Sequence, residues 1–176
     1  MIGSNFSTSG RASLYTPEQR RRRDATPWTA VQGLLAILQF AVFLASLALV
    51  IRYLLTGDGL FEATVSVVIK TIALYAIMVT GSIWEKVVFG RYLFAPAFYW
   101  EDVVSMLVLA LHTAYLATLA FGWMSDREQM LLALAAYATY AINAAQFVFK
   151  LRRARLEAPV HSHQNLGDCR TMRIPP

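Results

Sequence analysis

Four long apolar segments, separated by short polar stretches, dominate the hydrophobic pattern of the chain. They cover about residues 28–55, 63–88, 100–124 and 129–151. Residues 28–51 and 129–149 contain no charged side chain at all. At about 1.5 Å of rise per residue, helices of this length span a hydrocarbon core of roughly 30 Å. The pattern therefore predicts an all-α membrane protein, a bundle of four transmembrane helices.

Helix-start and helix-stop signals mark the ends of these segments. Thr26 followed by Pro27 is typical of an N-cap with proline at the first helical position. The sequence TGDG at 56–59 ends the first segment, and SDRE at 125–128 forms a short polar turn. We therefore assign residues 27–156 to one transmembrane domain. The basic N-terminal tail, residues 1–26, and the polar C-terminal tail, residues 157–176, are expected to be disordered.

Composition and charge agree with a membrane protein. Hydrophobic residues make up 57% of the chain and charged residues 15%, against roughly 25% charged in a soluble domain. Mean hydropathy is +0.46. The net charge of +5 comes from basic residues that flank the apolar segments. Such residues set topology and contact lipid headgroups, so the expected partner is the lipid bilayer, and no nucleic-acid partner is expected.

The distribution of basic residues also predicts the orientation. They gather in the N-terminal flank, the middle connection and the C-terminal flank, at Arg20, Arg21, Arg22, Arg23, Lys86, Arg91, Lys150, Arg152, Arg153 and Arg155. The other two connections hold only Arg52 and Arg127. The positive-inside rule places both termini in the cytoplasm. An even number of spans requires both termini on one side, so the two arguments agree.

Each segment carries a polar stripe at helical spacing. The stripes are Gln32, Gln39, Ser46 and Tyr53; Thr71, Tyr75, Met78, Ser82 and Glu85; Glu101, Ser105, Val108, His112 and Tyr115; and Thr139, Asn143, Gln146 and Lys150. A four-helix bundle would turn these stripes inward, away from lipid. Small residues in the fourth segment would allow close packing there.

Ionisable groups inside or at the ends of the spans are the candidate catalytic residues: Glu85, Glu101, Asp102 and His112. Such groups are costly in a membrane and are read first as functional. Other roles stay open. Glu101 and Asp102 would also complement a helix dipole, and His112 would also serve as a hydrogen-bond partner of another helix. Lys70 either extends to the membrane surface or is buried with a partner.

Aromatic and amide side chains are the candidate substrate-binding residues: Tyr75, Trp84, Phe98, Trp100, Tyr115, Asn143 and Gln146. The aromatic residues between the carboxyl groups would suit a flat, apolar ligand. The amides also fit a purely structural role as hydrogen-bonding links between helices. Trp100 also fits the aromatic belt of a membrane protein.

The chemistry of these groups narrows the function. The sequence has no nucleotide-binding loop, no nucleophile elbow, and no CxxC or HExxH motif. A carboxyl group in apolar surroundings can act as a proton donor near neutral pH. A neutral imidazole can ligate a metal, including the central metal of a tetrapyrrole. Together these residues suit acid-catalysed chemistry on a planar molecule that partitions into the bilayer.

Three long blocks of the chain resemble the 2-vinyl bacteriochlorophyllide hydratase family of phototrophic bacteria. They are LYTPEQRRRRDATPWTAVQG, IMVTGSIWEKVVFGRYLFAPAFYWEDVVSMLVLALHTAYLA and ALAAYATYAINAAQFVFKLRRARL, within about four fifths of the chain. The resemblance implies hydration of the ring-A vinyl group of a chlorophyllide or bacteriochlorophyllide to a 1-hydroxyethyl group. It implies a multi-pass protein of the bacterial inner (intracytoplasmic) membrane. Other enzymes of bacteriochlorophyll biosynthesis are then candidate partners.

Roles follow from the expected reaction, in which the terminal vinyl carbon is protonated and water then adds beside the ring. Glu101 or Glu85 is the expected donor, with Asp102 placing or deprotonating the water. No cofactor is expected, and magnesium enters only as part of the substrate, with His112 as its candidate ligand. Glu101 and His112 lie about 16 Å apart along one helix, which is long for a single tetrapyrrole.

Two other classes of protein compete with the hydratase. A non-enzymatic tetrapyrrole-binding or photosynthetic assembly subunit would use the aromatic residues and His112 but would not need the acids. A small transporter would pair Lys70 with an acid along a pathway, although the chain has no internal repeat.

Overall fold

The computed structural model describes residues 14–156, and every regular element in that range is a helix. The helices are α1 (Pro17–Ala25), α2 (Pro27–Thr56), α3 (Leu60–Phe89), α4 (Tyr99–Phe121) and α5 (Asp126–Leu156). The helices α2 to α5 are each long and apolar enough to cross a membrane. The prediction of an all-helical chain with four membrane-spanning segments is confirmed to that extent. The tails at 1–13 and 157–176 lie outside the described residues.

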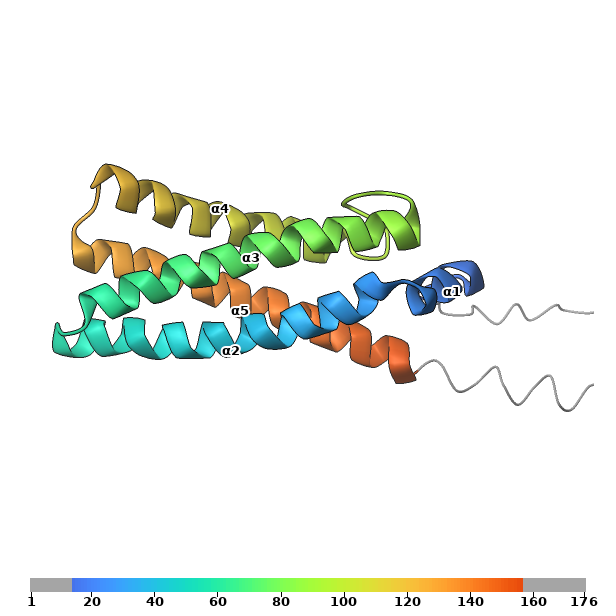
Figure 1. The fold of residues 1–176 in the computed structure, drawn as a ribbon, viewed down its shortest axis with the longest axis horizontal. Helices are drawn as coiled ribbons and strands as arrows, with labels where there is room; N and C mark the ends of the chain where they lie inside the picture. The colour runs from blue at the N-terminus through green and yellow to red at the C-terminus, as the bar shows by residue number, and fades with distance from the viewer. Residues whose placement is uncertain (1–13, 157–176) are drawn as a thin grey trace, which may run out of the picture.

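The four long helices form two hairpins, α2 with α3 and α4 with α5, that pack against each other (Figure 1). The α2–α3 and α4–α5 connections lie at one end of the bundle. The opposite end, called here the α1 end, holds α1, the α3–α4 connection and the C-terminal part of α5 (Figure 1). This antiparallel arrangement brings residues near 85, 101 and 150 to the same end of the molecule.

Glycine ends three of the long helices. Gly57, Gly90 and Gly122 follow α2, α3 and α4 in the left-handed conformation, with φ of 80°, 81° and 64°. Residues with a Cβ rarely adopt this conformation, so glycine is favoured at such C-caps. The cap at Gly122 ends the third span at Phe121, slightly before the expected boundary near residue 124.

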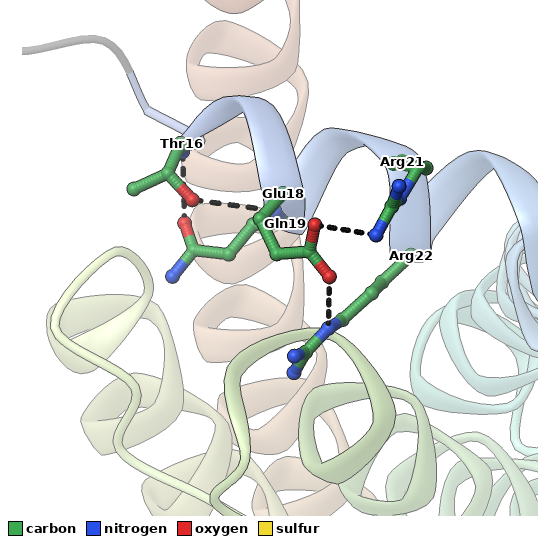
Figure 2. Close-up of polar contacts among 5 residues, drawn as sticks. All are labelled: Thr16, Glu18, Gln19, Arg21 and Arg22. Carbon is green, nitrogen blue, oxygen red and sulfur yellow. Dashed lines mark hydrogen bonds and ion pairs between the residues drawn. The ribbon is translucent and has the colours of Figure 1, made fainter.

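Helix α1 departs from the expectation that residues 1–26 are disordered. Its start is a capping box: Thr16 Oγ1 accepts from Gln19 N at 3.2 Å, and Thr16 N donates to Gln19 Oε1 at 2.9 Å (Figure 2). Glu18 binds Arg21 and Arg22 on the next turn (Figure 2). Hydrogen bonds from these guanidinium groups lower the pKa of Glu18 below its ordinary value. Local capping thus forms a helix where composition predicted none.

Tyr15 anchors α1 to the bundle. Its ring is buried and stacks on Phe89 with a centroid distance of 5.8 Å, and it lies 6.3 Å from Phe98. The guanidinium of Arg23 covers the ring at 4.9 Å. Burial raises the pKa of the Tyr15 hydroxyl, although Arg23 acts in the opposite direction. The segment before α1 is therefore part of the folded α1 end.

The bundle interior mixes apolar and polar side chains, while large apolar side chains such as Leu34 and Ile37 point outward. Four helices contribute to one apolar core: Phe43, Val50, Ala63, Val67, Leu74, Val108, Tyr115, Met130, Ala133, Tyr137 and Tyr140. Gln39, Ser46, Thr71 and Ser105 are buried with it, as expected of inward polar stripes. An outward apolar surface around a partly polar interior is the arrangement suited to lipid.

Two alanines of α5 test this packing. Ala133 is fully buried, whereas Ala135 is exposed on the same helix. We expect Ala133→Leu to destabilise the fold by about 1–3 kcal/mol, because the added methylenes have no space in a packed core. Ala135→Leu adds the same atoms on the outer face and should change stability little. Unfolding of the detergent-solubilised variants measures both; equal stabilities would contradict the assigned faces.

Candidate functional site

Three carboxyl groups and one ammonium group meet at the α1 end. Glu85 comes from α3, Glu101 and Asp102 from the first turn of α4, and Lys150 from α5. All three acids are buried. Lys150 Nζ forms an ion pair with Glu101 Oε2 at 2.6 Å. The antiparallel fold thus brings Glu85 to two acids that lie 16 and 17 residues further along the sequence, a juxtaposition that helical spacing alone did not reveal.

Glu85 and Asp102 form a carboxyl pair across the α3–α4 interface. Their side chains are hydrogen-bonding neighbours. Each also accepts a backbone hydrogen bond from the α3–α4 connection: Phe94 N donates to Asp102 Oδ2 at 2.7 Å, and Ala95 N donates to Glu85 Oε2 at 3.4 Å. Phe94 adopts a left-handed conformation with φ of 58°. The pair therefore holds this connection in place as well as presenting two carboxyl groups.

A cluster of aromatic rings surrounds Phe98, directly beside the acids. Phe98 is buried and its ring lies 5.9 Å from Trp84, 5.8 Å from Phe89 and 5.8 Å from Phe147. Lys150 Nζ lies 4.9 Å from the centre of the same ring. Trp84 and Phe98 were expected as binding residues. Tyr15 and Phe147 were missed, since only the packing of α1 and α5 brings them here.

The other aromatic candidates lie elsewhere. Trp100 is 71% exposed and packs edge-on against Tyr99, on the outside of the bundle. Tyr75 is hydrogen-bonded to Thr113 through its hydroxyl at 2.9 Å. Tyr115 is buried, and its backbone oxygen accepts from Gln129 Nε2 near the end opposite α1. The structure therefore does not bring these three side chains together with the acids.

His112 is fully buried in the middle of the bundle, away from the acids. Its Nδ1 lies 2.8 Å from the Val108 carbonyl oxygen, which can only accept, so Nδ1 carries the proton. The ring lies 5.8 Å from Tyr137, and Nε2 has no partner within the described part of the chain. No three His, Cys, Asp or Glu side chains in residues 14–156 converge to hold a metal ion. Among the described residues, His112 therefore presents a single unprotonated ring nitrogen, Nε2, with no protein partner.

The position of Lys70 decides between extension to the membrane surface and burial with a partner, the two alternatives that the sequence left open. It is fully buried, with Nζ 3.7 Å from the centre of the Tyr140 ring. When the Gln39 amide is oriented with its oxygen toward the lysine, Gln39 Oε1 accepts from Nζ at 3.3 Å. Among the described residues no carboxylate forms an ion pair with Lys70. Lys70 is therefore buried with a π-face and an amide, and lacks the acid partner that a transport pathway would need.

The two amides of α5 differ in their bonding. Asn143 Nδ2 donates to Ser105 Oγ on α4 at 2.8 Å, so Asn143 does link two helices. Gln146 lies one turn from Lys150, and its buried Oε1 has no protein partner in the described range. The expected structural role thus holds for one amide and leaves the other unexplained.

The Glu101–Lys150 pair provides a test of the site's energetics. Its side chains are only 10% and 25% exposed, so Lys150→Met should leave a buried carboxylate unpaired and destabilise the protein by about 1–3 kcal/mol. Adding Glu101→Gln should recover part of this loss. As a matched control, Arg21→Met breaks the exposed pair with Glu18 and should cost less than about 1 kcal/mol. Unfolding measurements of the double-mutant cycle check the expectation; additive effects would contradict it.

Comparison with known proteins matches the chain to one family over nearly all of its described length. The family model for 2-vinyl bacteriochlorophyllide hydratase matches residues 15–153. A relative of that name from Rhodobacter capsulatus is 66% identical over 148 residues, covering 84% of this chain and 86% of the relative. Another from Cereibacter sphaeroides is 67% identical over 144 residues, covering 82% and 89%. No solved structure matches the chain. The chain belongs to the 2-vinyl bacteriochlorophyllide hydratase family.

Proposed function

We propose that this chain hydrates the ring-A vinyl group of a chlorophyllide or bacteriochlorophyllide to a 1-hydroxyethyl group, as a hydro-lyase of bacteriochlorophyll biosynthesis. Family membership carries this proposal, because the match includes α2, α3, α4, all but the last three residues of α5, and every residue of the acid cluster. Relatives that are about two thirds identical bear the name of a hydratase. The buried carboxyl pair is the feature of the fold that suits the reaction.

Addition of water to a vinyl group on a conjugated ring needs a proton first. Protonation of the terminal carbon leaves a cation beside the macrocycle, where the ring delocalises the charge, and water then adds at that carbon. The protein must supply a proton donor, a positioned water and a site that orients the pigment. Nothing in this reaction requires a redox group, so side-chain acids can carry the chemistry.

Glu85, paired with Asp102, is our preferred proton donor. Two carboxylates in contact repel each other, so a buried pair is favoured to hold one proton between them. That proton is available to the vinyl carbon, and the partner carboxylate can take a proton from the incoming water. Glu101 was an equal candidate on sequence grounds. Its Oε2 is already engaged in the ion pair with Lys150 Nζ, whereas Glu85 faces a second carboxyl group. We therefore assign Glu101 to orienting Lys150.

The pigment is proposed to bind against the aromatic cluster, with its vinyl group toward the carboxyl pair. Phe98 and Trp84 are the candidate contacts, because both rings are flat, Phe98 packs against Lys150 and Trp84 packs against Phe98. His112 stays a hypothesis as a magnesium ligand. The unprotonated Nε2 is the correct atom for axial ligation. However, His112 and Glu101 are about 16 Å apart along α4, which is too far for one pigment to contact both residues readily.

The membrane setting follows from charge and helix length. Basic residues gather at the α1 end, including Arg20 to Arg23, Lys86, Arg91 and Lys150. By the positive-inside rule this end faces the cytoplasm, with both termini on that side. We propose the bacterial inner (intracytoplasmic) membrane as the location, with the acids near its cytoplasmic surface. A pigment that partitions into the bilayer would then reach the site together with neighbouring enzymes of the same pathway.

The decisive assay uses membranes containing the protein, a 3-vinyl chlorophyllide and water enriched in heavy oxygen. We expect a product heavier than the substrate by one labelled water, with absorption shifted to the blue as the vinyl group leaves conjugation. Membranes without the protein are the control. Pigment that binds but stays unchanged would instead favour the non-enzymatic binding subunit.

Substitution of the acids tests their roles. Glu85→Gln keeps an acceptor for Ala95 N but cannot supply the acidic proton, so we expect turnover to fall about 100-fold or more while pigment binding persists. Glu101→Gln should have a smaller effect. Glu62→Gln, in the first turn of the same helix and exposed, is the matched control and should leave turnover unchanged. Full activity of Glu85→Gln would rule out Glu85 as the donor.

A further inference from the structure

Besides the Tyr115 hydroxyl, three buried acceptor atoms on α4 and α5 have no protein hydrogen-bond partner in the described chain: Gln146 Oε1, Asn143 Oδ1 and His112 Nε2. Buried polar atoms are nearly always hydrogen-bonded, to protein or to ordered water, so each such atom needs an explanation. All three share one chemical property. They accept hydrogen bonds, so what they lack is a donor.

The local bonding fixes this acceptor character. Asn143 Nδ2 donates a hydrogen bond to Ser105 Oγ, which leaves the side-chain oxygen of Asn143 free to accept one. His112 donates from Nδ1 to the Val108 carbonyl, so Nε2 keeps its lone pair. Gln146 contributes Oε1 from the turn between Asn143 and Lys150. Water donates two hydrogen bonds and typically occupies sites lined by several unsatisfied buried polar groups. Water is therefore the ligand that this set of acceptors fits.

Two of the acceptors lie directly beneath the acid cluster. Ser105 is one helical turn from both Glu101 and Asp102 on α4, and it binds Asn143. Gln146 is one turn from Lys150 on α5, which is about 6 Å along the helix axis. The Lys150–Glu101 ion pair and the Asn143–Ser105 hydrogen bond thus form successive links between the same two helices. In the sequence of α5, Gln146 lies between the two residues that form these links.

Other amides of the bundle show what a purely structural role looks like. Gln32 Nε2 donates to Thr80 Oγ1 at 2.7 Å across α2 and α3. Gln129 Nε2 donates to the Tyr115 carbonyl at 3.4 Å across α4 and α5. Gln146 makes no such interhelical bond in the described residues, although its oxygen is buried. A link between helices therefore does not account for Gln146.

We propose that Gln146 and Asn143 hold the water molecule that adds to the vinyl group. The two side-chain oxygens accept both hydrogens of the water, which turns its lone pairs away from α5 toward the carboxyl pair and the pigment. This inference rests on the proposed hydratase function and deepens it. It reassigns the two amides from binding the pigment to positioning the second reactant.

The reaction balances with these groups alone. The Glu85–Asp102 pair gives its proton to the terminal vinyl carbon, and the two electrons of the vinyl π-bond form the new C–H bond. The water oxygen then forms a C–O bond to the carbon next to the ring. The excess proton on that oxygen passes to the carboxyl pair, which regains its starting state. One water is consumed and no oxidant or reductant takes part.

Kinetics of matched variants test the role of the water site. Gln146→Met preserves side-chain length and removes the acceptor, and Asn143→Leu does the same for its neighbour. We expect each to lower kcat about 10-fold or more, with KM and pigment affinity within about twofold of the unchanged protein. Gln32→Met removes an amide of the α2–α3 interface and should leave kcat unchanged. Wild-type kcat in Gln146→Met, or a loss confined to KM, would overturn the proposal.

Water at the site can be observed without catalysis. Water-edited solid-state NMR of the protein in liposomes measures how fast magnetisation passes from water to each side-chain amide. We expect fast transfer to Asn143 and Gln146, and slower transfer to Gln39, which is buried and bonded within the protein. Transfer no faster than at Gln39 would overturn the proposal whatever the activity.

The two measurements separate the failure of this inference from failure of the proposed function. Fast transfer in a protein that forms no heavy-oxygen product would refute the hydratase, and the water would then be structural only. Labelled product without water at the two amides would leave the hydratase standing and refute the water site.

Discussion

Polar groups on apolar helices must find their partners inside the bundle, because lipid tails offer none. This requirement accounts for most of the contacts described above. Ser46 bonds with Ser66 and Tyr137, Lys70 faces a tyrosine ring and an amide, and Glu101 binds Lys150. Each contact joins different helices, so the same bonds that remove polar atoms from lipid also fix how the helices pack.

At the α1 end, the buried polar contacts both support the structure and position the candidate catalytic groups. Asp102 and Glu85 accept backbone hydrogen bonds from the α3–α4 connection and so hold an irregular segment, including the strained Phe94, in one conformation. The same bonds keep two carboxyl groups in contact beside the aromatic cluster around Phe98. Structural support and candidate chemistry are therefore not alternatives for these acids. A carboxyl pair that is fixed from several sides is also a preorganised one, which is what acid catalysis requires.

Much of the fold and part of the site could be predicted from residue patterns. The spans near 28–55 and 63–88 correspond closely to α2 and α3, because long apolar runs and glycine caps leave few alternatives. The acids were identified since charges at span ends are conspicuous. Helix α1 was missed, because its charged composition resembles a disordered tail while its stability comes from capping and from Tyr15. Trp100 was grouped with the acids on sequence proximity, yet it faces outward.

The sequence by itself determined the four apolar helices, their polar stripes and the family. The helices and stripes depend on local periodicity, and the family depends on long stretches of characteristic sequence. It did not determine which polar groups meet. Glu85 with Asp102, Glu101 with Lys150 and Asn143 with Ser105 are pairs between helices. Only the tertiary structure decided them, because helix rotation and axial offset set those contacts, and both arise from packing of all four helices together.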